Sequence, residues 1–136
     1  MFKIAPFLVI SFISCCNFTF SQQDSPLHLA QAQLDAYNKG DIDAFMKCFH
    51  EDISIWQLGA EAPSIDGFDA VKNAYKELFE ASPDLYCEVI NRSAVGNKVL
   101  DYEKVTGRKG SDKTLFLIMI YEIKDGKIWK CTSVRE

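Results

Sequence analysis

Two acidic residues two positions apart, Asp101 and Glu103, could act as a catalytic pair. They stand in residues 98–106, which predict a β-strand, so their side chains share one face of that strand. Carboxylates that face an enclosed site can take up and return protons as general base and general acid. Carboxylates on an outer face form surface salt bridges instead, so the orientation of the strand decides their role.

The run His50-Glu51-Asp52 groups three further titratable side chains. An imidazole beside carboxylates could transfer protons, but no nucleophile or metal ligand accompanies this run. A solvated helix end explains the run more simply, because a histidine is favoured near the C-terminus of a helix. We therefore predict no catalytic role for these three residues.

Five cysteines are present, and two of them, Cys15 and Cys16, lie in the apolar N-terminal segment. Cys48, Cys87 and Cys131 are widely spaced, with no Cys-x-x-Cys pair and no histidine cluster, so we predict no metal site and no cofactor. Buried free thiols are expected from the tendency of cysteine to be buried. One disulfide plus one free thiol is the alternative in an oxidising compartment.

Residues 1–22 have the layout of a secretory signal peptide, because one positive charge at Lys3 precedes an almost wholly apolar run. The run is short for a membrane-spanning helix. We predict cleavage and export to the periplasm or the medium, with one domain over residues 23–136. The alternative is a lipid anchor at Cys15 in the cell envelope, because residues 12–15 resemble a bacterial lipoprotein box.

The predicted domain is acidic. The signal peptide contains one of the 15 basic residues and none of the 19 acidic ones, which leaves a net charge of −5. An acidic domain without a basic stripe is a poor partner for nucleic acid or an anionic membrane. Its length suits a single domain with a real hydrophobic core.

Helical periodicity and capping residues predict helices first and strands last. Gly96-Asn97 and Asp125-Gly126 predict two tight hairpin turns. This order indicates an α+β fold, with helices covering one face of an antiparallel sheet that curls around a pocket. The predicted helices span residues 26–39, 42–49 and 68–80, and the predicted strands span residues 53–58, 85–95, 98–106, 114–124 and 127–135.

Three stretches, in their order and spacing, resemble the nuclear transport factor 2-like superfamily and, within it, the SnoaL-like domains. They are Asn38-Lys39-Gly40-Asp41-Ile42-Asp43 with Phe49-His50-Glu51-Asp52, then residues 66–71, and finally residues 121–128. The resemblance covers nearly all of residues 25–136. It implies a cone-shaped roll, commonly dimeric, with three N-terminal helices packed on a curved antiparallel sheet. The group includes polyketide cyclases, ketosteroid isomerases, limonene epoxide hydrolases and many members of unknown activity.

The resemblance also locates the catalytic positions of these enzymes, and the expected acids are missing. Ketosteroid isomerases have a carboxylate base, a tyrosine and a protonated aspartate where this chain has Gln57, Gln33 and Met119. The Arg-x-Asp pair of the epoxide hydrolases corresponds to Lys104-Val105-Thr106, and their second aspartate corresponds to Ser133. Neither standard mechanism is predicted, and the fold alone does not confer an activity.

The resemblance implies a strand orientation in which several polar side chains point into an otherwise apolar pocket. The predicted ligand-binding residues are Gln57, Tyr102, Lys104, Tyr121, Ser133 and Arg135. The cations could hold an anionic group, or they could be rim residues whose charged ends reach water. In this orientation Asp101 and Glu103 point outward. If the orientation of the strand were wrong by one residue, both side chains would point into the pocket.

We therefore predict an exported domain that binds a small, largely apolar molecule without the standard catalytic acids. The alternative is an isomerase, cyclase or hydrolase with a non-standard acid–base site in the same pocket. Phe116, Ile118 and Ile120 are expected on the outer face of the sheet, where large apolar residues need a partner. This predicts a homodimer through that face. A purely structural dimer would instead have a pocket filled by its own side chains.

Overall fold

The computed structural model describes residues 25–135, and the predicted signal peptide, with Cys15, lies outside the described residues. Three helices and six strands form the domain. The helices are α1 (Pro26–Lys39), α2 (Ile42–Met46) and α3 (Phe68–Ala81). The strands are β1 (Phe49–Gln57), β2 (Ile65–Asp66), β3 (Tyr86–Val95), β4 (Lys98–Thr106), β5 (Leu115–Lys124) and β6 (Lys127–Val134).

The first two helices begin and end where the capping residues predict. The Ser25 hydroxyl accepts a hydrogen bond from the backbone N–H of His28 at 3.1 Å, and the Asp41 carboxylate accepts one from the N–H of Ala44 at 3.0 Å. Gly40 ends α1 in the left-handed conformation at φ 64°, which glycine adopts without steric cost. The chain therefore turns sharply from α1 into α2.

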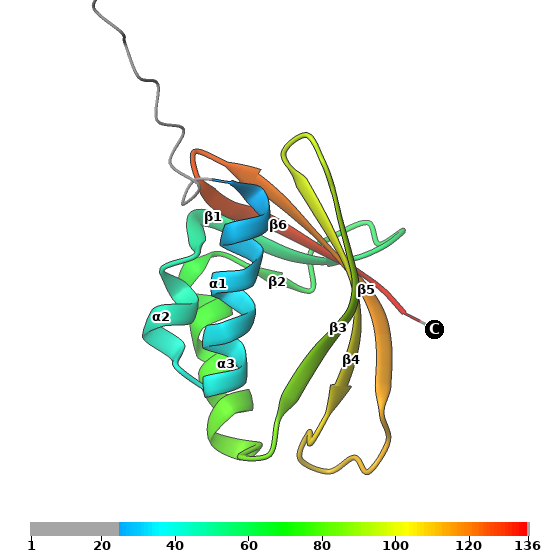
Figure 1. Cartoon of the computed structure of the whole chain (residues 1–136). Helices are drawn as coiled ribbons and strands as arrows, with labels where there is room; N and C mark the ends of the chain where they lie inside the picture. The colour runs from blue at the N-terminus through cyan, green and yellow to red at the C-terminus, as the bar shows by residue number, and fades with distance from the viewer. Residues whose placement is uncertain (1–24, 136) are drawn as a thin grey trace, which may run out of the picture.

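The predicted α+β fold is confirmed, with one difference in the sheet. The strand order is β2-β1-β6-β5-β4-β3, and the sheet is mixed because β1 runs parallel to β6 while the other pairs are antiparallel. Many residues, including α3, separate β1 from β6, and a connection of that length permits parallel pairing. The sheet curls around α1 and α3, which stand against its concave side (Figure 1).

The start of β1 corrects the interpretation of His50-Glu51-Asp52 as a helix end. The helix α2 ends at Met46, and the run belongs to β1, where Phe49 already pairs with Ile128 of β6. The strand β2 is absent from the prediction, because two residues are too few to show a pattern. It pairs with β1 at Ile65 and Asp66 and closes the sheet on that side.

The core lies between the helices and the concave face of the sheet. Its fully buried apolar side chains include Phe45, Ile53, Val71, Val99 and Ile128. The cysteines of the described domain are buried free thiols, as expected from their burial tendency: Cys48, Cys87 and Cys131. No helix in residues 25–135 is long and apolar enough to cross a membrane.

Candidate functional site

A cavity of about 300 Å³ separates α1 and α3 from the concave face of the sheet. Most of its wall is apolar and comes from both layers, with Leu34, Leu78, Val105, Leu115, Leu117 and Met119 among the lining residues. Pockets for small organic ligands have this character, in which apolar walls surround a few polar groups. The cavity is therefore the candidate site, and its polar groups decide what it can do.

Glu103 is the acidic side chain that lines this cavity. It projects inward from β4, opposite Leu117 of β5, and is 5% exposed. The Tyr121 hydroxyl donates a hydrogen bond to Glu103 Oε1 at 2.8 Å. The carboxyl group is thus held in one position, with its surroundings largely apolar.

The surroundings of Glu103 make it titrate close to neutral pH. Burial raises the pKa of the Glu103 carboxyl to about 7, against the opposing effect of the Tyr121 hydrogen bond, and the negative charge of Asp101 adds to the rise. Burial also raises the pKa of Tyr121 and of Cys87, so both groups stay protonated. Glu103 can therefore gain or release a proton at a pH where its neighbours do not.

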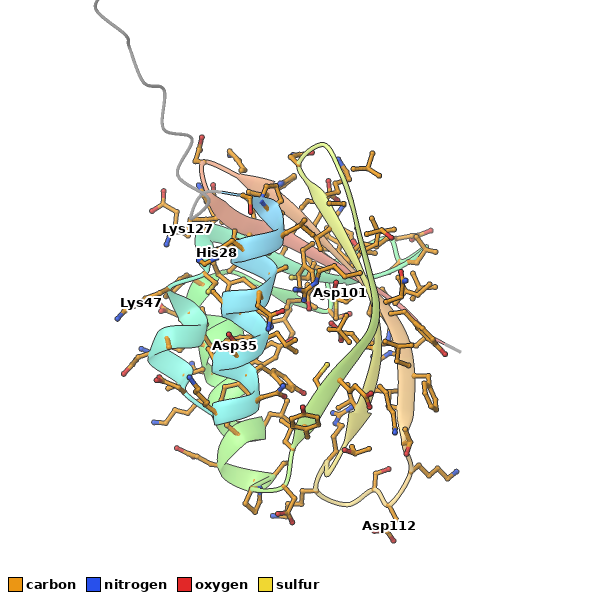
Figure 2. The ribbon with its side chains drawn as sticks, viewed as in Figure 1. His28, Asp35, Lys47, Asp101, Asp112 and Lys127 are labelled. Atoms are coloured by element: carbon orange, nitrogen blue, oxygen red, sulfur yellow. The ribbon has the colours of Figure 1, made fainter. Side chains whose placement is uncertain are left out.

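Asp101, the second acid on this face of β4, is held in an ion pair. Arg92 of β3 donates to both carboxylate oxygens of Asp101 at 2.7 Å and to Gln31 of α1 at 2.8 Å. A bulge between Val89 and Asn91 shifts the register of β3, so that Arg92 lies directly opposite Asp101. Asp101 lies inside the molecule, between the strands and α1 (Figure 2), and is already paired there.

The orientation predicted for β4 is wrong by one residue. Tyr102 and Lys104 lie on the outer face of the sheet, not in the cavity. Tyr102 is 42% exposed and stacks on Phe116, with 6.2 Å between the ring centroids, while Lys104 reaches Glu88 at 3.7 Å. The physical reason is the pairing with β5, because directly paired residues share a face, and Tyr102 pairs with Ile118.

The remaining predicted residues do line the cavity: Gln57, Tyr121, Ser133 and Arg135. With its amide oxygen facing the guanidinium, Gln57 accepts hydrogen bonds from Arg135 Nη2 at 2.6 Å and Nε at 3.1 Å. The Ser133 hydroxyl donates to the backbone carbonyl of Trp56 at 3.2 Å. Their binding of a ligand remains a prediction.

Gln33 is a polar group of the cavity that sequence reasoning did not select. It lines the cavity from α1, is 6% exposed, and its Oε1 has no hydrogen-bond partner among the described residues. A buried acceptor without a partner costs about 1–3 kcal/mol of stability.

Within residues 25–135, no group of three or more histidine, cysteine or acidic side chains is placed to hold a metal ion. The polar groups of the cavity are instead suited to hydrogen bonding, to ion pairing at the rim and to proton exchange at Glu103.

Comparison with known proteins gives one family and a set of similar structures. The model of the SnoaL-like domain family matches residues 30–131. An uncharacterized cystatin-fold protein from Novosphingobium aromaticivorans is 22% identical, with a TM-score of 0.76 over 82% of this chain and 98% of that one. No curated protein sequence matches.

Two further solved structures show the same fold at lower identity. An NTF2-like protein of unknown function from Cytophaga hutchinsonii is 15% identical, with a TM-score of 0.68 over 82% of this chain and 90% of that one. An LEH-like epoxide hydrolase of M. tuberculosis is 17% identical, with a TM-score of 0.68 over 82% of both chains. These similarities establish the fold, and the site must be argued from the residues present.

Proposed function

Because the chain belongs to the SnoaL-like domain family, we propose that it is an exported protein whose cavity binds a small, largely apolar molecule. The observation that carries this proposal is a largely apolar cavity of about 300 Å³ with a few polar side chains, such as Gln33, Gln57 and Ser133, in its wall. Export rests on the layout of residues 1–22, and a lipid anchor at Cys15 is the alternative.

Binding is tested with N-phenyl-1-naphthylamine, a neutral fluorescent probe that carries one N–H donor. Replacing Ala74 by phenylalanine places a ring in the wall of the cavity, since Ala74 lines it from α3. We expect Ala74→Phe to weaken probe binding by about tenfold or more, equivalent to about 1.4 kcal/mol. Fluorescence titration of both proteins measures this difference.

The control is Ala70→Phe, which adds the same ring on the same helix at an exposed position outside the cavity. This variant is expected to bind the probe as the wild type does. Equal weakening by both substitutions, or no probe binding by the wild type, would contradict the proposed function.

A second candidate function is proton transfer by Glu103, as an isomerase, cyclase or hydrolase would need. The observation that favours it is a carboxyl group held by Tyr121 in an apolar cavity, where burial raises the pKa of Glu103 to about 7. Such a group can remove a proton from a bound molecule and return it elsewhere on that molecule. Glu103 occupies neither of the catalytic positions that the resemblance assigned to Gln57 and Ser133, so this site would be a non-standard one.

We also propose that the protein forms a homodimer through the outer face of its sheet. Phe116 is 50% exposed there and lies against Tyr102 and next to Ile118, which is also exposed. The oppositely charged Lys104 and Glu88 flank these apolar residues. A two-fold axis can bury such a patch against its own copy and pair the charges at its edge.

Replacing Ile118 by glutamate is expected to turn the dimer into a monomer, because each copy would bury an unpaired charge in the interface. Sedimentation at micromolar concentration measures the change. Val95→Glu is the matched control, since Val95 is exposed at the end of β3, away from Ile118. A monomeric wild-type protein would contradict the dimer.

A further inference from the structure

The cavity opens beside four cationic side chains that come from two separate segments. Arg108 and Arg135 line both the cavity and an adjoining hollow, which Lys109 and Lys113 also line. The hollow therefore joins the cavity at its exposed end, where Leu115 is also common to both. We call this end of the cavity, with Arg108, Lys109, Lys113 and Arg135, the basic mouth. Such a cluster is unexpected on a chain with a formal net charge of −4.

The geometry at Arg135 leaves part of its guanidinium free. Gln57 accepts hydrogen bonds from Nη2 and Nε of Arg135, which fixes the plane of the group. A guanidinium has five N–H donors, so three remain, including one on each terminal nitrogen. Two parallel donors of this kind match the two oxygens of a carboxylate or a related oxyanion.

Arg108 is brought to the mouth by its loop. Gly107 has φ 76°, and an added Cβ there would lie 1.9 Å from the carbonyl oxygen of Asp84, so only glycine lets this loop approach so closely. The backbone N–H of Lys109 also donates to the Ser82 hydroxyl at 3.0 Å. Burial raises the pKa of Tyr37, and the positive charge of Arg108 opposes this rise in part, which agrees with the place of Arg108 in the cavity wall.

The cations of the mouth have no acidic ion-pair partner among the residues that the structure describes. Among residues 25–135, the ion pairs within 4.0 Å do not include Arg108, Lys109, Lys113 or Arg135. The loop from residue 107 to residue 114 contains one acid, Asp112, and it lies at the outer tip of that loop (Figure 2). An anion in the mouth would therefore meet mostly positive charge.

We propose that the molecule bound in the cavity is an amphiphile with one anionic group, such as a carboxylate, sulfonate or phosphate. This inference rests on the proposed function. The apolar body fills the cavity toward Glu103 and Gln33, and the anionic group lies in the mouth between Arg108 and Arg135. This arrangement keeps the anion away from the Glu103 carboxyl group, which would repel it when ionised.

Two fluorescent probes with the same aromatic skeleton test this assignment. N-phenyl-1-naphthylamine is neutral, and 8-anilinonaphthalene-1-sulfonate carries one sulfonate. We expect the wild type to bind the sulfonate about tenfold more tightly, because hydrogen bonds to charged groups are stronger than neutral ones. The preference is expected to fall as salt is added, since the mouth is exposed.

The double variant Arg108→Met/Arg135→Met keeps long apolar stems at the mouth and removes both charges. It is expected to lose the preference for the sulfonate, measured as the ratio of its affinities for the two probes. Lys76→Met is the control, because Lys76 is an exposed cation on α3 outside the cavity. It is expected to keep the preference, and circular dichroism confirms that each variant is folded.

The outcomes separate the two proposals. Equal binding of both probes by the wild type overturns the anionic class and leaves the proposed function intact. A preference that survives in the double variant also overturns it, since the sulfonate would then bind elsewhere, for example on the outer face of the sheet. Failure of both probes to bind overturns the proposed function itself.

Discussion

Replacing Arg92 by methionine is expected to lower the free energy of unfolding by about 3–5 kcal/mol. The substitution leaves the Asp101 carboxylate, which is 1% exposed, without the two charged hydrogen bonds that now hold it. It also removes the contact from Arg92 to Gln31 that ties α1 to the sheet. Urea unfolding at neutral pH measures the loss.

Two variants show whether the buried charge is the cause. Arg92→Met/Asp101→Leu removes both charges and is expected to recover most of the lost stability, because an apolar pair often replaces a buried ion pair at little cost. Lys98→Met breaks a partly exposed pair with Glu122 and is expected to cost no more than about 1 kcal/mol. A loss of that small size in Arg92→Met would contradict a buried ion pair.

The elements that sequence reasoning predicted best depend on neighbouring residues. Ser25, Gly40 and Asp41 fix the ends of α1 and α2 through contacts within a few positions. The turns at Gly96-Asn97 and Asp125-Gly126 join their strands as predicted, with Asp125 and Gly126 both at positive φ. Local chemistry of this kind is readable from the chain alone, and so are the number and order of the main strands.

The orientation of β4 could not be predicted in the same way, because distant partners set it. Charge alone favours Tyr102 inside and Glu103 outside. The structure reverses this, since Tyr121, 18 residues further along the chain on β5, donates a hydrogen bond to Glu103. The sequence did contain one local indication of the true orientation. Val99 and Val105 share a strand face with Glu103, and an apolar face is expected to be buried, as both valines are. The pocket residues Gln57 of β1 and Ser133 of β6 were placed correctly, and they pair directly, so their side chains share a face.

The Glu103→Gln variant is expected to change how stability depends on pH. Burial raises the pKa of Glu103 from 4.5 to about 7, so the folded state holds a proton that the unfolded state releases between these two values. The wild type therefore loses stability, relative to the variant, as the pH rises from about 4.5 to about 7. The full loss is about 3 kcal/mol, at about 1.36 kcal/mol for each pKa unit.

Glutamine is a suitable replacement because its amide oxygen can still accept the hydrogen bond from Tyr121. Urea unfolding of the wild type and Glu103→Gln at pH 4, 5.5, 7 and 8 gives the difference between the two profiles. Glu61→Gln is the control, since Glu61 is an exposed acid outside the cavity, and its profile is expected to parallel the wild type. A parallel profile for Glu103→Gln as well would mean that Glu103 does not take up a proton near neutral pH. Proton transfer would then lose its basis, whereas ligand binding, which needs no titrating carboxyl group, would not.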